Sequence, residues 1–139
     1  MKLSTRVRYG TRAMLDLALH RDDEPVSLRE VCERQDVSES YLENLMSPLR
    51  AAGLVRTVRG YGGGYALARS PADITLGDVV RALDGSLAPV ECVDKAGLCD
   101  RADGCVTRVI WTRVKRAMEG VLDDVTLSAL VDMQQTGCT

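Results

Sequence analysis

The sequence contains no phenylalanine and few other aromatic residues, which limits how it can build a core. Aromatic residues make up 4% of the 139 residues, whereas apolar residues make up 45%. Leucine, valine, alanine and methionine must therefore fill the interior, and this mixture is typical of helices rather than of a β-sandwich. The length fits one domain, or a small domain with an appended helix. We therefore expect a mainly α-helical chain.

Long apolar runs are also missing from the sequence. No stretch approaches the roughly 20 apolar residues that a membrane helix needs, and the first residues lack the apolar run of a signal peptide. We therefore expect a cytoplasmic protein with no membrane partner. In a reducing cytoplasm, the five cysteines indicate metal binding, redox sensing or burial before they indicate structural disulfides.

The net charge of −2 is distributed unevenly along the chain. Residues 1–70 hold 11 Lys and Arg against 9 Asp and Glu, whereas residues 71–139 hold 7 against 11. Residues 47–72 contain four arginines and no acidic residue. A local positive field of this kind attracts phosphates. The small negative net charge therefore does not exclude a nucleic-acid partner.

Apolar periodicity and capping residues predict three helices before residue 53. The first covers residues 5–20, where apolar side chains recur at helical spacing. Ser27 and Glu30 form a capping box at the start of the second helix, which runs to about residue 35. The third helix begins after a further capping serine and ends near residue 52, before a glycine. Two short helices joined by such a tight turn form the helix-turn-helix pattern.

The third helix has one apolar side and one polar side. Four residues at positions i, i+3, i+4 and i+7 face the core: Leu42, Leu45, Met46 and Leu49. A helix-turn-helix offers the N-terminal part of its second helix to base edges in the major groove. We therefore predict DNA contacts from Ser38, Ser40, Tyr41, Glu43, Asn44, Ser47 and Arg50. Asn44 suits adenine, and Glu43 suits the N4 amine of cytosine. The alternative is an ordinary solvated helix face.

A glycine-rich hairpin follows the third helix. Residues 54–59 and 65–68 read as strands, and the turn between them contains four glycines and one tyrosine. Glycines let a backbone lie close to a phosphate or enter a minor groove. We therefore predict a cationic wing that contacts DNA through Arg56, Arg59, Gly62 and Gly63. A nucleotide-binding loop is the alternative, but such a loop opens a helix, whereas this one returns into a strand.

The second half of the chain predicts helices on either side of a cysteine-containing loop. Thr75 opens a fourth helix that ends at Gly85, no period holds through residue 104, and residues 106–122 form the longest helical pattern. The apolar stripe of this long helix is wider than a small domain needs, so we expect it to pack against a second subunit. We therefore predict a winged helix-turn-helix over residues 1–72. Residues 73–139 form a helical sensor and dimerisation region with a cysteine loop at 86–105.

Three cysteines within the loop are candidate metal ligands. Cys92, Cys99 and Cys105 have the spacing C-x6-C-x5-C. Thiolates are the usual ligands of iron-sulfur clusters and of zinc. Free thiols or a redox disulfide are the alternatives. We expect Cys32, on the apolar side of the second helix, to be buried. We expect His20, near the end of the first helix, to interact with the helix dipole.

Several motifs occur together along almost the whole chain. They are Leu3-Ser4-Thr5 through Arg12-Ala13, Ser40-Tyr41-Leu42-Glu43, Pro48-Leu49-Arg50, Gly53-Leu54-Val55, Arg59-Gly60 with Gly62-Gly63-Gly64-Tyr65, Ile74-Thr75-Leu76-Gly77-Asp78-Val79, and Trp111. In combination they resemble the iron-sulfur-cluster regulators, the winged-helix repressors typified by IscR-like and NsrR-like proteins. The resemblance implies a homodimer joined through the long helix, with two reading helices on one palindromic DNA site. It also implies that Cys92, Cys99 and Cys105 bind a [2Fe-2S] or [4Fe-4S] cluster.

The fourth cluster ligand differs from the family pattern. Many IscR-like members have a histidine three residues after the last cysteine, where this sequence has Arg108. NsrR-like members use an acidic residue near the start of the partner chain, where this sequence has Arg8. The remaining candidates are a carboxylate, a residue of the partner subunit or a small thiol. The nearby carboxylates are Glu91, Asp100 and Asp103.

The sequence therefore predicts a DNA-binding transcriptional regulator, a repressor rather than an enzyme. Its cluster would sense redox, iron or nitric oxide state. One alternative is a cluster-free regulator with a thiol or zinc switch. Another is a small iron-sulfur redox protein, but the sequence has no second cofactor motif and no acid-base pair at useful spacing.

Overall fold

Hydroxyl side chains begin five of the α-helices. In each case a serine or threonine oxygen accepts a hydrogen bond from a backbone N–H in the first turn, which leaves that amide satisfied. Ser27 with Glu30, and Thr75 with Asp78, form reciprocal capping boxes, so the predicted box at the second helix is confirmed. The capping residues are Ser4, Ser27, Ser38, Thr75 and Thr126.

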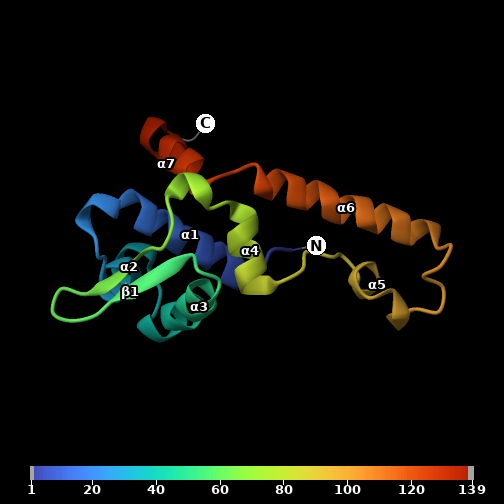
Figure 1. The fold of residues 1–139 in the computed structure, drawn as a ribbon, viewed down its shortest axis with the longest axis horizontal. Helices are drawn as coiled ribbons and strands as arrows, with labels where there is room; N and C mark the ends of the chain where they lie inside the picture. The colour runs from blue at the N-terminus through green and yellow to red at the C-terminus, as the bar shows by residue number, and fades with distance from the viewer. Residues whose placement is uncertain (1, 138–139) are drawn as a thin grey trace.

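The computed structural model describes residues 2–137, so Cys138 lies outside the described residues. The α-helices are α1 (Thr5–Leu19), α2 (Leu28–Gln35), α3 (Glu39–Ala51), α4 (Leu76–Asp84), α5 (Glu91–Asp94), α6 (Val106–Asp123) and α7 (Leu127–Thr136). Short 3-10 helices cover Arg21–Asp23 (η1), Pro71–Asp73 (η2) and Ala96–Leu98 (η3). The strands are β1 (Val55–Val58) and β2 (Gly64–Leu67). The predicted fold, mainly α with a β-hairpin wing, is confirmed (Figure 1).

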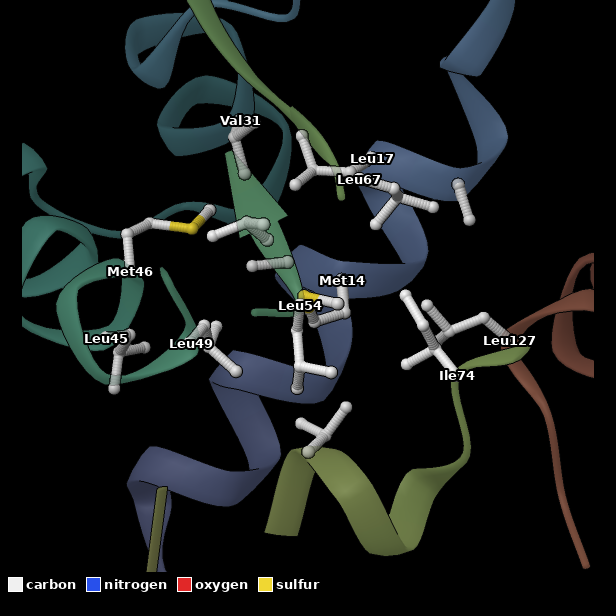
Figure 2. Packing of buried hydrophobic residues seen from close by; sticks show 14 of the residues in the cluster. Met14, Leu17, Val31, Leu45, Met46, Leu49, Leu54, Leu67, Ile74 and Leu127 are labelled. Atoms are coloured by element: carbon white, nitrogen blue, oxygen red, sulfur yellow. The ribbon is translucent and has the colours of Figure 1, made fainter. Parts of the chain in front are cut away.

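The hydrophobic core is built around α1 and the inner face of α3. All four residues predicted to face inward from α3 are buried. Met14 and Leu17 of α1 belong to the same buried cluster, together with Leu54 and Leu67 (Figure 2). Ile74, before α4, and Leu127, at the start of α7, are completely buried in the same cluster. The core therefore does not divide at residue 72, because both halves of the chain contribute to it.

One buried carboxylate joins α1 to α2. The side chain of Asp16 is only 2% exposed. The guanidinium of Arg34 donates to both carboxylate oxygens, with shortest distances of 2.7 Å and 2.9 Å, and the amide of Gln35 donates at 2.9 Å. His20 ends α1, where its Nδ1 lies 2.9 Å from the Asp16 carbonyl oxygen and 3.5 Å from the carboxylate. These partners compensate the desolvation of a charge inside the core.

The wing is attached to the body of the protein at its base. β1 and β2 pair antiparallel, with Val55 opposite Leu67 and Val58 opposite Gly64. Val26, from the segment before α2, exchanges two backbone hydrogen bonds with Tyr65, of 2.9 Å and 2.7 Å. A side chain on Gly64 would overlap the Val26 carbonyl group. The base of the hairpin therefore packs directly against this segment.

Helix α6 extends away from the body, and α5 lies beside its far end (Figure 1). None of its residues is fully buried. Large apolar side chains along it are exposed: Val106, Val109, Ile110, Trp111 and Val121. Helix α7, which follows, was not predicted from the sequence and packs against α1.

Candidate nucleic-acid interface and cysteine loop

The outer face of α3 is exposed and polar. Ser40, Glu43, Asn44, Ser47 and Arg50 are all exposed, because the apolar residues between them turn into the core. Within residues 2–137, the side chains of Glu43 and Asn44 make no hydrogen bond or ion pair. Their polar atoms are therefore free to meet base edges. Ser38 is also exposed, and its hydroxyl caps the helix by accepting from the Tyr41 amide at 3.1 Å.

Tyr41 differs from the other polar residues predicted to contact DNA. It is half-buried, and its ring packs edge-on against Tyr9 of α1, with centroids 5.9 Å apart. Its hydroxyl is buried and has no hydrogen-bond partner among the described residues. Arg12 lies over the other ring, 5.4 Å from the Tyr9 centroid. In this structure Tyr41 therefore supports α3 against α1 and does not point outward with its neighbours.

The two wing arginines have different surroundings. Arg59 and Tyr61 are exposed near the tip of the hairpin, which projects at the end of the molecule opposite α5 (Figure 1). Arg56 instead donates to the carboxylate of Glu24 at 3.0 Å. No local sequence pattern predicts this pair, because the two residues are 32 positions apart. Gly60 and Gly62 have positive φ angles of 101° and 76°. A residue with a side chain would be strained in this backbone conformation.

The three loop cysteines occupy different local structures at the end of α6 far from the wing. Cys92 lies in α5 and is half-buried, Cys99 follows η3 and is exposed, and Cys105 is the N-cap residue of α6. Two contacts tie α5 to α6. Arg108 donates to the Cys92 carbonyl at 2.8 Å, and Lys115 pairs with Asp94 at 2.8 Å. The arginine at the position of the family histidine therefore holds the loop backbone.

The thiols of Cys105 and Cys32 have opposite electrostatic environments. The Thr107 hydroxyl lies 3.2 Å from the Cys105 sulfur. A hydrogen bond from Thr107, with one from the Arg108 backbone, lowers the pKa of the Cys105 thiol. Burial raises the pKa of Cys32, and the nearby Glu39 and Glu43 carboxylates add to this effect. Cys32 is 7% exposed, which confirms its predicted burial.

The donor chemistry of the loop fits a thiolate-bound metal group, but its present arrangement does not form a coordination site. Among residues 2–137, no three Cys, His, Asp or Glu side chains are gathered closely enough to hold one metal ion. The loop must therefore close if its three thiols are to bind the same group.

Among residues 2–137, no helix is both long and apolar enough to cross a membrane.

A helix-turn-helix with a free polar face on its second helix and a hairpin wing beside it defines a winged-helix transcriptional regulator. The chain belongs to the Rrf2 family: residues 3–133 match the family model, which is described as an iron-dependent transcriptional regulator. Both the predicted resemblance and the prediction of a DNA-binding regulator rather than an enzyme are confirmed.

Similar proteins support this assignment in sequence and in structure. The chain is 46% identical to protein rrf2 of Nitratidesulfovibrio vulgaris, over 94% of this chain and 87% of that protein. It is 43% identical to the HTH-type transcriptional regulator IscR of Serratia proteamaculans, over 96% and 81%. The structure of T. potens IscR matches with a TM-score of 0.82 and 43% identity, over 100% of this chain and 92% of that one. CymR, the global cysteine regulator of B. subtilis, matches with a TM-score of 0.78 and 41% identity, over 95% and 97%.

Proposed function

We propose that the chain is a repressor that binds a palindromic promoter site in double-stranded DNA as a homodimer. The outer face of α3, exposed and without partners at Glu43 and Asn44, carries this proposal. This face enters the major groove, and the wing reaches the neighbouring phosphates. The contacting residues are Ser38, Ser40, Glu43, Asn44, Ser47 and Arg50 of α3, with Arg59, Gly62 and Gly63 of the wing. Arg56 would have to break its ion pair with Glu24 before it could contact DNA. Tyr41 packs on the inner side of α3 and supports the helix.

The second subunit packs on α6. The exposed apolar residues of this helix continue into a groove with an entirely apolar lining, made by Leu3, Leu87, Ala117, Met118, Val121 and Leu122. Contiguous apolar surface of this kind indicates a protein interface. Two subunits joined here would place their α3 helices on successive major grooves, roughly 34 Å apart. Residues 1–72 then read DNA and residues 73–139 mediate assembly and sensing, although both share one core.

The cysteine loop gives the regulator a sensor. Cys92, Cys99 and Cys105 would hold a [2Fe-2S] or [4Fe-4S] cluster, which supplies a response to redox, iron or nitric oxide state when bound. Their thiol chemistry, the iron-dependent description of the family and the similarity to IscR support this role. Arg108 and Lys115 tie the loop to α6, so rearrangement of the loop would act directly on the dimerisation helix.

A cluster-free switch is the second candidate for the sensor. The three sulfurs are not gathered in the described residues, and Cys99 is exposed to solvent. Another similar structure, of Staphylococcus aureus CymR, is of an oxidized form, which also favours a response to oxidation. In this case the loop would respond through thiol oxidation or through zinc.

The DNA-binding proposal is tested with Arg59→Ala. Losing one phosphate contact should weaken binding to every sequence and reduce the slope of log affinity against log salt concentration by about 0.9. Lys95→Ala is the control, because it removes one exposed positive charge from the cysteine loop. Fluorescence anisotropy over a salt series measures both variants. A salt dependence unchanged by Arg59→Ala would remove the wing from the interface.

The sensor proposal is tested by purifying the protein without oxygen and measuring iron, sulfide and zinc. Bound iron and sulfide should be lost in Cys92→Ser, Cys99→Ser and Cys105→Ser and retained in Cys32→Ala, because Cys32 lies in the core. Protein that contains zinc but no iron or sulfide would support the second candidate. Formation of a disulfide between the loop thiols on mild oxidation would also support it. Either result leaves the DNA-binding proposal intact.

A further inference from the structure

Helix α6 is joined to the DNA-reading part of the molecule at its last turn. There it packs against α4, whereas Arg108 and Lys115, nearer its other end, contact α5. Helix α4 packs in turn against both α1 and α3, and Leu83 of α4 fills the space where a side chain on Gly10 of α1 would lie. The contact between α4 and α6 therefore links the dimerisation helix to the reading helix.

Polar side chains join the two helices at the solvent-exposed edge of this junction, where Arg81 and Asp123 are 46% and 44% exposed. The guanidinium of Arg81 in α4 donates to both oxygens of Asp123 in α6, at 2.7 Å and 3.4 Å. Arg81 also lies 3.5 Å from Asp78, which caps α4 together with Thr75. The pKa of Arg81 is raised, first by its hydrogen bond to Asp123. The ends of the two helices are thus held by one ionic cluster.

The backbone around the junction is also tightly constrained. Gly77 in α4 is buried, and a side chain there would overlap the Asp123 carboxylate. Immediately after α6, the Val125 carbonyl accepts from the Leu76 amide at 2.9 Å, and the Ile74 carbonyl accepts from the Leu127 amide at 2.9 Å. The end of α6 is therefore fixed by the ion pair, by close packing and by backbone hydrogen bonds.

We infer that Asp123 is a positioning residue that sets the angle between α6 and the reading head, and through it the half-site spacing that the dimer accepts. This inference rests on the proposed homodimer. Eighteen helical residues span about 27 Å, so a 10° tilt at the junction moves the far end of α6 by about 5 Å. Base pairs are stacked about 3.4 Å apart. This displacement of α6 relative to its reading head exceeds one base-pair step, so we expect a small change at the junction to alter the half-site spacing of the dimer.

The test compares Gly77→Ala and Asp123→Asn with the control Asp124→Asn. Alanine at position 77 favours a helix more than glycine does, so its effect will come from displacing Asp123. Asp124 is exposed at the C-terminal end of α6, and its side chain makes no hydrogen bond or ion pair within residues 2–137. The DNA is a palindromic duplex selected in vitro with the wild-type protein, together with duplexes whose half-sites are one or two base pairs closer or farther apart.

In wild type and Asp124→Asn, affinity should fall sharply away from the selected spacing. In Gly77→Ala and Asp123→Asn the ratio between selected and altered spacings should fall by about twofold or more. Binding to non-specific DNA, thermal unfolding and dimer mass are measured on the same samples. Arg81→Met removes the α4 partner of Asp123 and so breaks the same ion pair. This variant replaces Gly77→Ala or Asp123→Asn if either fails to fold.

Two results would overturn the inference in different ways. The inference is wrong if the variants fold and keep the sharp spacing preference of the wild type. This holds for Asp123→Asn, Gly77→Ala and Arg81→Met together, and it leaves the proposed dimer intact. A monomeric wild-type protein, or one with no spacing preference, would overturn the proposed dimer on a palindrome and this inference with it.

Discussion

Asp16 holds the first two helices of the reading head together. It is the one charged side chain in the core of the described residues, and it meets Arg34 and Gln35 at the end of α2. Arg12 extends the same network, because it donates to Gln35 at 2.9 Å and stacks on Tyr9. Tyr9 then contacts Tyr41 at the start of α3. The position of the reading helix thus depends on polar contacts as well as on the apolar core.

Asp16→Asn should lower the free energy of unfolding by about 3 kcal/mol, the low end for removing one partner of a buried pair, because Arg34 is 34% exposed. Urea titration followed by circular dichroism measures this change. Glu33→Gln is the control, since its pair with Arg29 is largely exposed, and it should cost no more than about 0.5 kcal/mol. Equal effects of the two substitutions would show that burial gives Asp16 no special role.

Asn44→Ala should change sequence preference at one base position, at a cost of about 1–3 kcal/mol for the preferred base. Selection of binding sites from random DNA measures the preference. Gln134→Ala on α7 is a matched control, because this exposed polar residue lies far along the chain from α3. Unchanged selection with Asn44→Ala would move the reading surface to another part of the molecule.

Residue-level predictions succeeded where local periodicity decides burial. The spacing of Leu42, Leu45, Met46 and Leu49 was sufficient to place them in the core. Tyr41 was predicted to reach bases or phosphates, but its ring packs against Tyr9, a residue of another helix. The ion pair between Arg56 and Glu24 could not be predicted from the sequence either. It forms only when the wing docks against the segment that holds Val26.

At the scale of elements, capping residues fix where the helices begin. The Asp78 carboxylate accepts from the Thr75 amide at 2.9 Å, and the Thr75 hydroxyl accepts from the Asp78 amide at 3.1 Å. Burial alone would raise the pKa of Asp78, but these hydrogen bonds, with Arg69 and Arg81 nearby, leave it lowered. The charged form of Asp78 is therefore favoured in the folded protein.

A lowered folded-state pKa stabilises the protein above the pKa of an unfolded aspartate, about 3.9, and this contribution disappears as the pH falls through the folded value. Asp78→Asn should thus destabilise the protein at neutral pH, and its difference from wild type should shrink in acid. Unfolding free energies measured from pH 7 to pH 2.5 test this expectation. Thr75→Ser keeps the capping hydroxyl and should keep the pH dependence. A difference that stays constant down to pH 2.5 would contradict the role of the charge.

Helix α7 shows why one element escaped prediction. Thr126 is a capping residue, and Leu127, Leu130 and Val131 share a face, but this is barely more than one turn of apolar periodicity. Its stability comes from docking against α1, a contact between opposite ends of the sequence. The long apolar stripe of α6 was visible for the opposite reason, because it repeats over several turns.

At the scale of the whole molecule, one core supports two surfaces. The reading face and wing lie on residues 1–72, but α4 and α7 complete the interior beneath them. Core residues beyond position 72 include Ile74, Val79, Val80, Leu83 and Leu127. The proposed functional boundary at residue 72 is therefore not a folding boundary.

A fragment ending at residue 72 should not fold. Loss of a large buried side chain costs about 2–5 kcal/mol, and this fragment loses five large apolar side chains of the core from a domain whose stability is of the order of 5–15 kcal/mol. Circular dichroism and limited proteolysis distinguish the folded and unfolded forms. Replacing residues 95–101, all of which are exposed, by glycine and serine should leave the full-length chain folded. Cooperative unfolding of the fragment would show that its core is self-sufficient.

The anchored base of the wing separates what can vary in this hairpin from what cannot. Gly64 and the pairing of Val26 with Tyr65 fix the root, whereas residues 59–62 of the tip are exposed. Tips of other lengths and compositions can therefore be grafted between Val58 and Gly64 without rebuilding the domain. Exchanging this tip between related regulators would therefore change the strength of the proposed phosphate contacts and leave the base-reading face of α3 as it is.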